Sequence, residues 1–157
     1  MDGKGWGWVG KYVIVIIAAL LLGVALGNLA LFKSATLGNP RLTAARLAEF
    51  IAHMAALSLL WSLGWQAAQQ MRDSSERLNG VATILVALVS LLITATGYVV
   101  LANFIGPFVS RDVMQMVNWL FILGVFGAAA WFIFALFAGA DDLMAAVRDA
   151  LAGKREV

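Results

Sequence analysis

The chain has 157 residues, of which 62% are hydrophobic and only 13% are charged, and its mean hydropathy is +0.89. A soluble domain carries about 25% charged residues, so much of this surface is expected to meet lipid. The net charge of +2 comes from scattered Lys and Arg without a basic cluster, which excludes a nucleic-acid partner. The absence of cysteine excludes disulfides, thiolate nucleophiles and Cys-ligated metals.

Four apolar segments are long enough to cross a bilayer, since about 20 apolar residues form a helix that spans about 30 Å. In chain order they are Tyr12–Phe32, Leu47–Gln66, Val81–Phe104 and Val113–Ala138. The first lacks a small-residue cleavage pattern and is expected to be retained; the alternative is a cleaved signal on a three-helix protein. Only helices or closed barrels satisfy the backbone in lipid, so residues 1–139 are predicted to form an all-α, integral membrane four-helix bundle.

The connections between these segments are short, which forces neighbouring helices to run antiparallel in an up-down-up-down order. Asn39-Pro40 predicts an N-cap followed by proline at the start of the second helix. Gly106-Pro107 predicts a tight break before the fourth. The expected connections are Lys33–Arg41, Ala67–Gly80 and Ile105–Asp112.

The last residues, 140–157, have a different character. Leu143, Val147 and Leu151 share one face of a short predicted helix, whereas its charged residues lie elsewhere. We therefore expect an amphipathic C-terminal helix that lies on the membrane surface or on a partner.

The distribution of Lys and Arg predicts the orientation, because cytoplasmic loops carry an excess of positive charge. One side of the membrane would hold seven of these residues and the other side four. Both termini, and thus the tail, are therefore expected in the cytoplasm, at a bacterial inner membrane. The seven are Lys4, Lys11, Arg72, Arg77, Arg148, Lys154 and Arg155, and the four are Lys33, Arg41, Arg46 and Arg111.

Polar residues gather in the outer half of the bundle. Arg46, Glu49 and His53 fall within about 60° on the second helix, and His53 lies about 10 Å deeper than Arg46. Ionisable groups at membrane depth cost about 2.5–3.5 kcal/mol unless they are paired or hydrated, and Glu49 is spaced to pair with both neighbours. The other members of this predicted outer pocket are Thr94, Tyr98, Asn103 and Asn118.

Two interpretations of these residues stay open. In the functional one, the outer pocket binds a quinone or a lipid headgroup, or relays protons. In the structural one, Arg46 and Glu49 form an ion pair near the headgroups, and His53 bonds to a neighbouring helix or subunit.

Small residues on three of the segments predict close helix packing, because they let backbones approach one another. An alternative interpretation is a pore lined by the hydroxyl groups of the third segment. The residues expected to pack are Gly23, Gly27, Ser90, Gly97, Gly124 and Gly127.

Several kinds of chemistry have no support in the sequence. A single histidine cannot supply both axial ligands of a haem, and neither metal-binding nor phosphate-binding motifs are present, so no catalytic or metal site is predicted.

The leading hypothesis is an accessory or scaffold subunit that contacts the bilayer and other membrane subunits or copies of itself. The alternatives are a small homo-oligomeric transporter or channel using Glu49 and His53, and a quinone- or lipid-binding redox subunit.

Overall fold

The computed structural model describes residues 7–38, 40–75 and 78–152, and for residues 146 and 149–152 it describes the backbone alone. Within these ranges the chain is helical, with one isolated bridge between Thr36 and Thr43. The all-α fold is therefore confirmed. The helices are α1 (Gly7–Asn28), α2 (Ala30–Ser34), α3 (Ala44–Ser74), α4 (Asn79–Ile105), α5 (Arg111–Ala138) and α6 (Ala140–Ala152).

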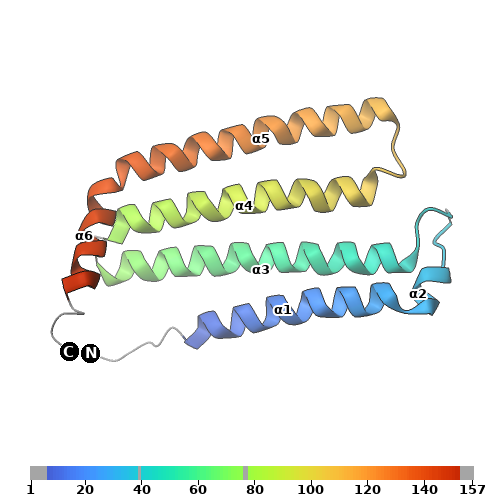
Figure 1. The fold of residues 1–157 in the computed structure, drawn as a ribbon, viewed down its shortest axis with the longest axis horizontal. Helices are drawn as coiled ribbons and strands as arrows, with labels where there is room; N and C mark the ends of the chain where they lie inside the picture. Colours follow the sequence, from blue (N-terminus) through green and yellow to red (C-terminus); the bar gives the residue numbers. More distant parts are fainter. Residues whose placement is uncertain (1–6, 39, 76–77, 153–157) are drawn as a thin grey trace.

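Four helices, α1, α3, α4 and α5, are long and apolar enough to cross a membrane, which confirms an integral membrane protein. They lie side by side and alternate in direction, so that the start of α1 and helix α6 are at one end and α2 is at the other (Figure 1). The up-down arrangement predicted from the short loops is thus confirmed.

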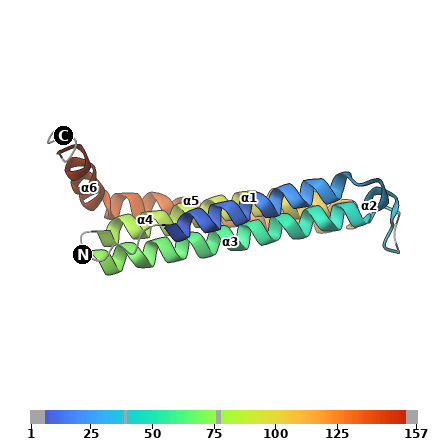
Figure 2. The same ribbon diagram turned by 90° about the horizontal axis from the view of Figure 1, so that it is seen from below.

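The four-helix arrangement is an open row rather than a ring around a shared core. In the described part of the chain, α1 packs on α3, α3 on α4 and α4 on α5, and no other two of these four helices touch. Figure 2 shows the row from its edge as a thin layer from which α6 rises on one side. Both broad faces of the layer are therefore left to lipid or to other proteins.

Two helix boundaries differ from those expected from hydropathy. The first apolar segment does not continue as one helix to Phe32, because Leu29 is extended and separates α1 from α2. The second membrane helix does not begin at Pro40, which lies in a turn. It begins at Ala44, where the Thr43 hydroxyl accepts a hydrogen bond from the Arg46 amide at 3.3 Å and acts as the N-cap.

The same helix also extends further than its apolar stretch, so the predicted connection Ala67–Gly80 is wrong. Helix α3 continues to Ser74, since its polar end is held by tertiary contacts. Ala68 is buried against Ala82 and Val86 of α4.

Other residues named from the sequence lie outside the described part of the chain: Lys4, Asn39, Arg77, Lys154 and Arg155, together with the side chain of Leu151.

Small side chains line the contacts between helices, and no large side chain among the described residues is fully buried. On α1, a Cβ added at Gly23 would overlap the Ala52 methyl group of α3. On α3, a Cβ added at Gly64 would lie 2.9 Å from a methyl group of Val89. Because lipid tails are as apolar as the helices, these close backbone approaches, and not the hydrophobic effect, hold the row together.

The close approach of Gly23 to Ala52 predicts how the α1–α3 interface responds to a larger side chain. Replacing Gly23 with leucine is expected to separate the two helices and to cost about 1–3 kcal/mol, the usual cost of overpacking. Thermal unfolding in mild detergent, followed by circular dichroism and size exclusion, measures the loss.

The matched control is Gly10→Leu on the same helix, where no heavy atom lies within 4 Å of the added Cβ. Equal thermal stability of the Gly23→Leu and Gly10→Leu proteins would contradict the described packing of α1 on α3.

Candidate functional site

Four of the seven residues of the predicted outer pocket lie together in one groove. The groove has a volume of about 450 Å³ and is lined by side chains from the first part of α3 and the last part of α4. One wall contains Phe50 and Phe104, whose rings stack with centroids 4.0 Å apart. The polar residues that line the groove are Thr96 and the four predicted ones, Arg46, Glu49, His53 and Asn103.

His53 is oriented by its own helix. Its Nδ1 lies 2.6 Å from the backbone carbonyl oxygen of Glu49. Because a carbonyl can only accept, Nδ1 must carry the proton in this bond. In the neutral ring Nε2 is then an acceptor, and no partner for it is found among the described residues. The imidazole therefore offers one ring nitrogen to a ligand, a proton or a neighbouring protein.

Glu49 is placed against α1. A Cβ added at Gly27 would overlap its carboxylate oxygen Oε1, so the absence of a side chain at Gly27 makes room for the acid. Glu49 is nevertheless exposed on the surface of the row. Within the described ranges, no hydrogen bond or ion pair reaches its carboxylate.

The ion pair between Arg46 and Glu49, which the structural interpretation requires, is not formed within the described chain. The Arg46 guanidinium turns back to the loop, where Nη1 lies 3.5 Å from the Arg41 carbonyl oxygen. The expected bond between the Glu49 carboxylate and His53 is also absent, since the imidazole bonds to the Glu49 backbone. Spacing along a helix permits such pairs, but the glycine on α1 gives the Glu49 side chain a different place.

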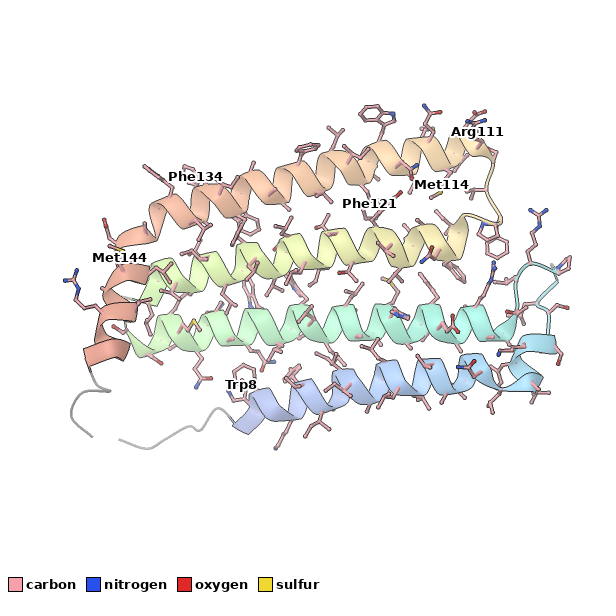
Figure 3. The ribbon with its side chains drawn as sticks, viewed as in Figure 1. Trp8, Arg111, Met114, Phe121, Phe134 and Met144 are labelled. Atoms are coloured by element: carbon pink, nitrogen blue, oxygen red, sulfur yellow. The ribbon has the colours of Figure 1, made fainter. Side chains whose placement is uncertain are left out.

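The other three residues of the predicted pocket lie at the contact between α4 and α5. The Tyr98 hydroxyl donates a hydrogen bond to Asn118 Oδ1 at 3.0 Å. Both residues line a separate, apolar groove of about 310 Å³. Phe121 also lines this groove, and its side chain lies between α4 and α5 in Figure 3. The Thr94 hydroxyl donates to the Ser90 carbonyl oxygen at 2.8 Å. The structure thus separates Tyr98 from His53.

In the described part of the chain, hydroxyl groups of α4 bond to their own helix and do not face a channel between the helices. Thr83 and Ser90, like Thr94, donate to carbonyl oxygens of their own helix. With the helices in a row, any closed pore would need further copies or partners.

The residues expected to pack have different surroundings. Gly23 and Gly27 contact α3, and a Cβ at Gly124 would lie 3.5 Å from the Thr94 methyl group. A Cβ added at Gly97 would have one neighbour within 4 Å, a methyl group of Leu57 at 4.0 Å. Ser90 is half-buried. Around Gly127 no described atom lies within 4 Å of an added Cβ.

A second polar cluster, at the opposite end of α1 and α3, was not predicted. The Trp8 indole donates to Gln70 at 2.7 Å, and Gln66 donates to the Tyr12 hydroxyl at 2.6 Å. Trp8 and Tyr12 are four residues apart on α1, and Gln66 and Gln70 are four residues apart on α3. This matching spacing is the sequence signal that could have revealed the cluster. Indole and phenol groups are enriched in general at the headgroup level of membranes.

Comparisons with known proteins place the chain in no family: no family model, curated protein or solved structure matches it. In the described ranges no group of three or more His, Cys, Asp or Glu could hold a metal ion.

The unpaired carboxylate generates a prediction. Glu49→Gln is expected to leave the thermal stability of the purified protein unchanged or to raise it, because the substitution removes a charge that has no partner. Breaking a buried ion pair would instead cost about 3–5 kcal/mol. The midpoint of thermal unfolding in detergent distinguishes the two outcomes.

Arg46→Gln is the matched control. If both variants were destabilised by the same amount, and the double variant by no more than either, the two side chains would be paired and the arrangement described above would be refuted.

Proposed function

We propose that this protein is an accessory or scaffold subunit of a larger membrane complex, of the respiratory, photosynthetic, transport or secretion type. Its partners would be other membrane subunits or further copies of the chain, which contact the face of the row that carries the α3–α4 groove. The proposal places it in a bacterial inner membrane, with both termini in the cytoplasm. The observation that carries it is the uncovered groove on a row that is one helix thick.

The row supports this role because its helices leave most of their surface free. Only 6% of the most apolar window of α1 and of α5 is buried, and 17% in each of α3 and α4. Apolar side chains can face lipid at no cost, but ionisable ones cannot. A scaffold needs broad accessible faces, and this chain has two.

The groove supports an occupant other than lipid tails. Glu49 lies about 8 Å along α3 from its first residue, and its carboxylate has no polar partner in the described chain. His53 and Asn103 line the same groove with free hydrogen-bonding capacity. A neighbouring helix that brings a donor or a cation would satisfy the acid and recover the cost of about 2.5–3.5 kcal/mol.

A photocrosslinking amino acid tests the proposal. Placed at Thr96, which lines the groove, it is expected to capture protein after extraction in gentle detergent. The equivalent substitution at Phe134 is the control, because that side chain is at the free edge of α5 (Figure 3). Native mass spectrometry then identifies the captured species as a partner or as a second copy.

Glu49→Gln is expected to weaken the captured complex at least about tenfold, the factor that 1.4 kcal/mol corresponds to, and Tyr98→Phe is expected to leave it unchanged. A stable monomer that crosslinks only to lipid from Thr96 would disprove the role as a subunit.

A second candidate function is proton-linked transport by a homo-oligomer. The observation that favours it is the presence of a carboxylate and an imidazole with an open ring nitrogen in one groove on the outer half of α3. Several rows would have to close around a path, because this row encloses none.

For this candidate, Glu49→Gln is expected to abolish proton flux through the protein in liposomes, since the amide cannot carry a proton, whereas Glu49→Asp retains part of it. Flux is measured with a pH-sensitive dye inside the vesicles. Equal flux through the wild type and the Glu49→Gln variant, or none through the wild type, rules this function out.

A further inference from the structure

Helix α6 is held at the end of the row by a contact that fixes its position. The Asp142 carboxylate accepts a hydrogen bond from the Gly80 amide at 3.1 Å. Gly80 lies in the first turn of α4, whose N-cap residue Leu78 provides no side-chain cap. An acid at this place also interacts favourably with the helix dipole. Thus α6 supplies the missing cap of α4.

Two glycines bring the backbones together at the same point. A Cβ added at Gly139 would lie 3.1 Å from the Gly80 carbonyl oxygen and 2.9 Å from a methyl group of Ile84. A Cβ added at Gly80 would overlap Asp142 and lie 3.0 Å from the Gly139 Cα. The start of α6 is therefore seated on the start of α4.

This seat is at the boundary of the apolar layer. Helix α5 is apolar up to Ala138, and Phe137 is 84% exposed, so lipid must reach almost to its end. Helix α4 becomes apolar at Val81, directly after the capped residue. Helix α6 begins at Ala140, two residues after α5 ends, and runs across the ends of the helices (Figure 1) and out beyond one face of the row (Figure 2).

The described side chains of α6 separate into two faces. At about 100° per residue, Leu143 and Val147 lie about 40° apart, whereas Asp141 lies about 160° from Leu143. Val147 is 51% exposed, and Leu143 and Ala140, which flank it around the helix, are also exposed. This apolar face is therefore not covered by the rest of the described chain.

We infer that α6 is an interfacial helix that inserts this apolar face into the headgroup–acyl boundary of the bilayer on the side of the α1 start. Such helices bury their apolar face about 5–10 Å into that boundary. Residues 140–157 contain four acidic and three basic residues, so attraction to anionic lipid does not contribute. The insertion depends on apolar area alone, and it is independent of the function proposed for the groove.

Single cysteines test this insertion in the full chain, which has no native cysteine. Leu143→Cys and Val147→Cys are labelled with an environment-sensitive fluorophore and reconstituted into phosphatidylcholine vesicles with brominated acyl chains. Asp141→Cys and Arg148→Cys are the matched controls on the charged face. The bromolipid is expected to quench labels on the apolar face about threefold more than labels on the charged face, as for an interfacial helix.

Aqueous iodide is expected to give the reverse order, and adding phosphatidylglycerol is expected to change neither result. Ala140→Cys serves as a further apolar-face site if Leu143→Cys fails to elute as the wild type does. Equal bromolipid quenching at all four sites, or iodide access to Val147→Cys equal to that at Arg148→Cys, would overturn the inference and leave the face to a protein partner. Quenching that appears only with phosphatidylglycerol would also overturn it.

Discussion

The close approach of helix backbones at small residues is the constraint on which the rest of the structure depends. In lipid, burying an apolar side chain between helices gains little, because the tails it leaves are equally apolar. Contacts therefore form where a missing side chain lets a neighbour come near, as Gly23 does for Ala52 and Gly64 for Val89. In the described part of the chain, these contacts join only membrane helices that follow one another in the sequence. The result is a row with two free faces, a shape that a water-soluble domain of this size could not keep.

The groove beside Glu49 is a consequence of the same packing. Gly27 creates the space that receives the acid, so the carboxylate lies on α1 instead of on Arg46. A packing glycine thereby leaves the Glu49 carboxylate exposed and without a partner in the described part of the chain. In lipid such a group would be costly in isolation, and the cost would be recovered when another molecule supplies a donor. In this protein, helix packing and the proposed recognition of partners are therefore linked through one contact.

The two ends of the row are built differently. At the end that carries α2, Arg41 donates a hydrogen bond to the Pro107 carbonyl oxygen at 3.2 Å and joins the loop before α3 to the loop before α5. At the other end, side chains join α1 to α3 through Trp8 and Gln70, and α6 caps α4 through Asp142. These polar contacts lie at the limits of the apolar segments, where water and headgroups compete for them. They join the helix ends without adding charge to the interior of the row.

The sequence by itself determined the fold class, the four membrane helices, their alternating direction and the C-terminal helix, because these depend on hydrophobic length and on loops too short for any other connection. It also placed Arg46, Glu49, His53 and Asn103 in one half of the bundle. Only the tertiary structure decided that the helices form a row and that Tyr98 and Asn118 meet at the α4–α5 contact, apart from the α3–α4 groove that His53 lines. It also decided that Asp142 caps α4 through Gly80, 62 residues away. Periodicity gives each helix a set of faces, but which neighbour meets each face is decided by contacts between residues distant in the chain.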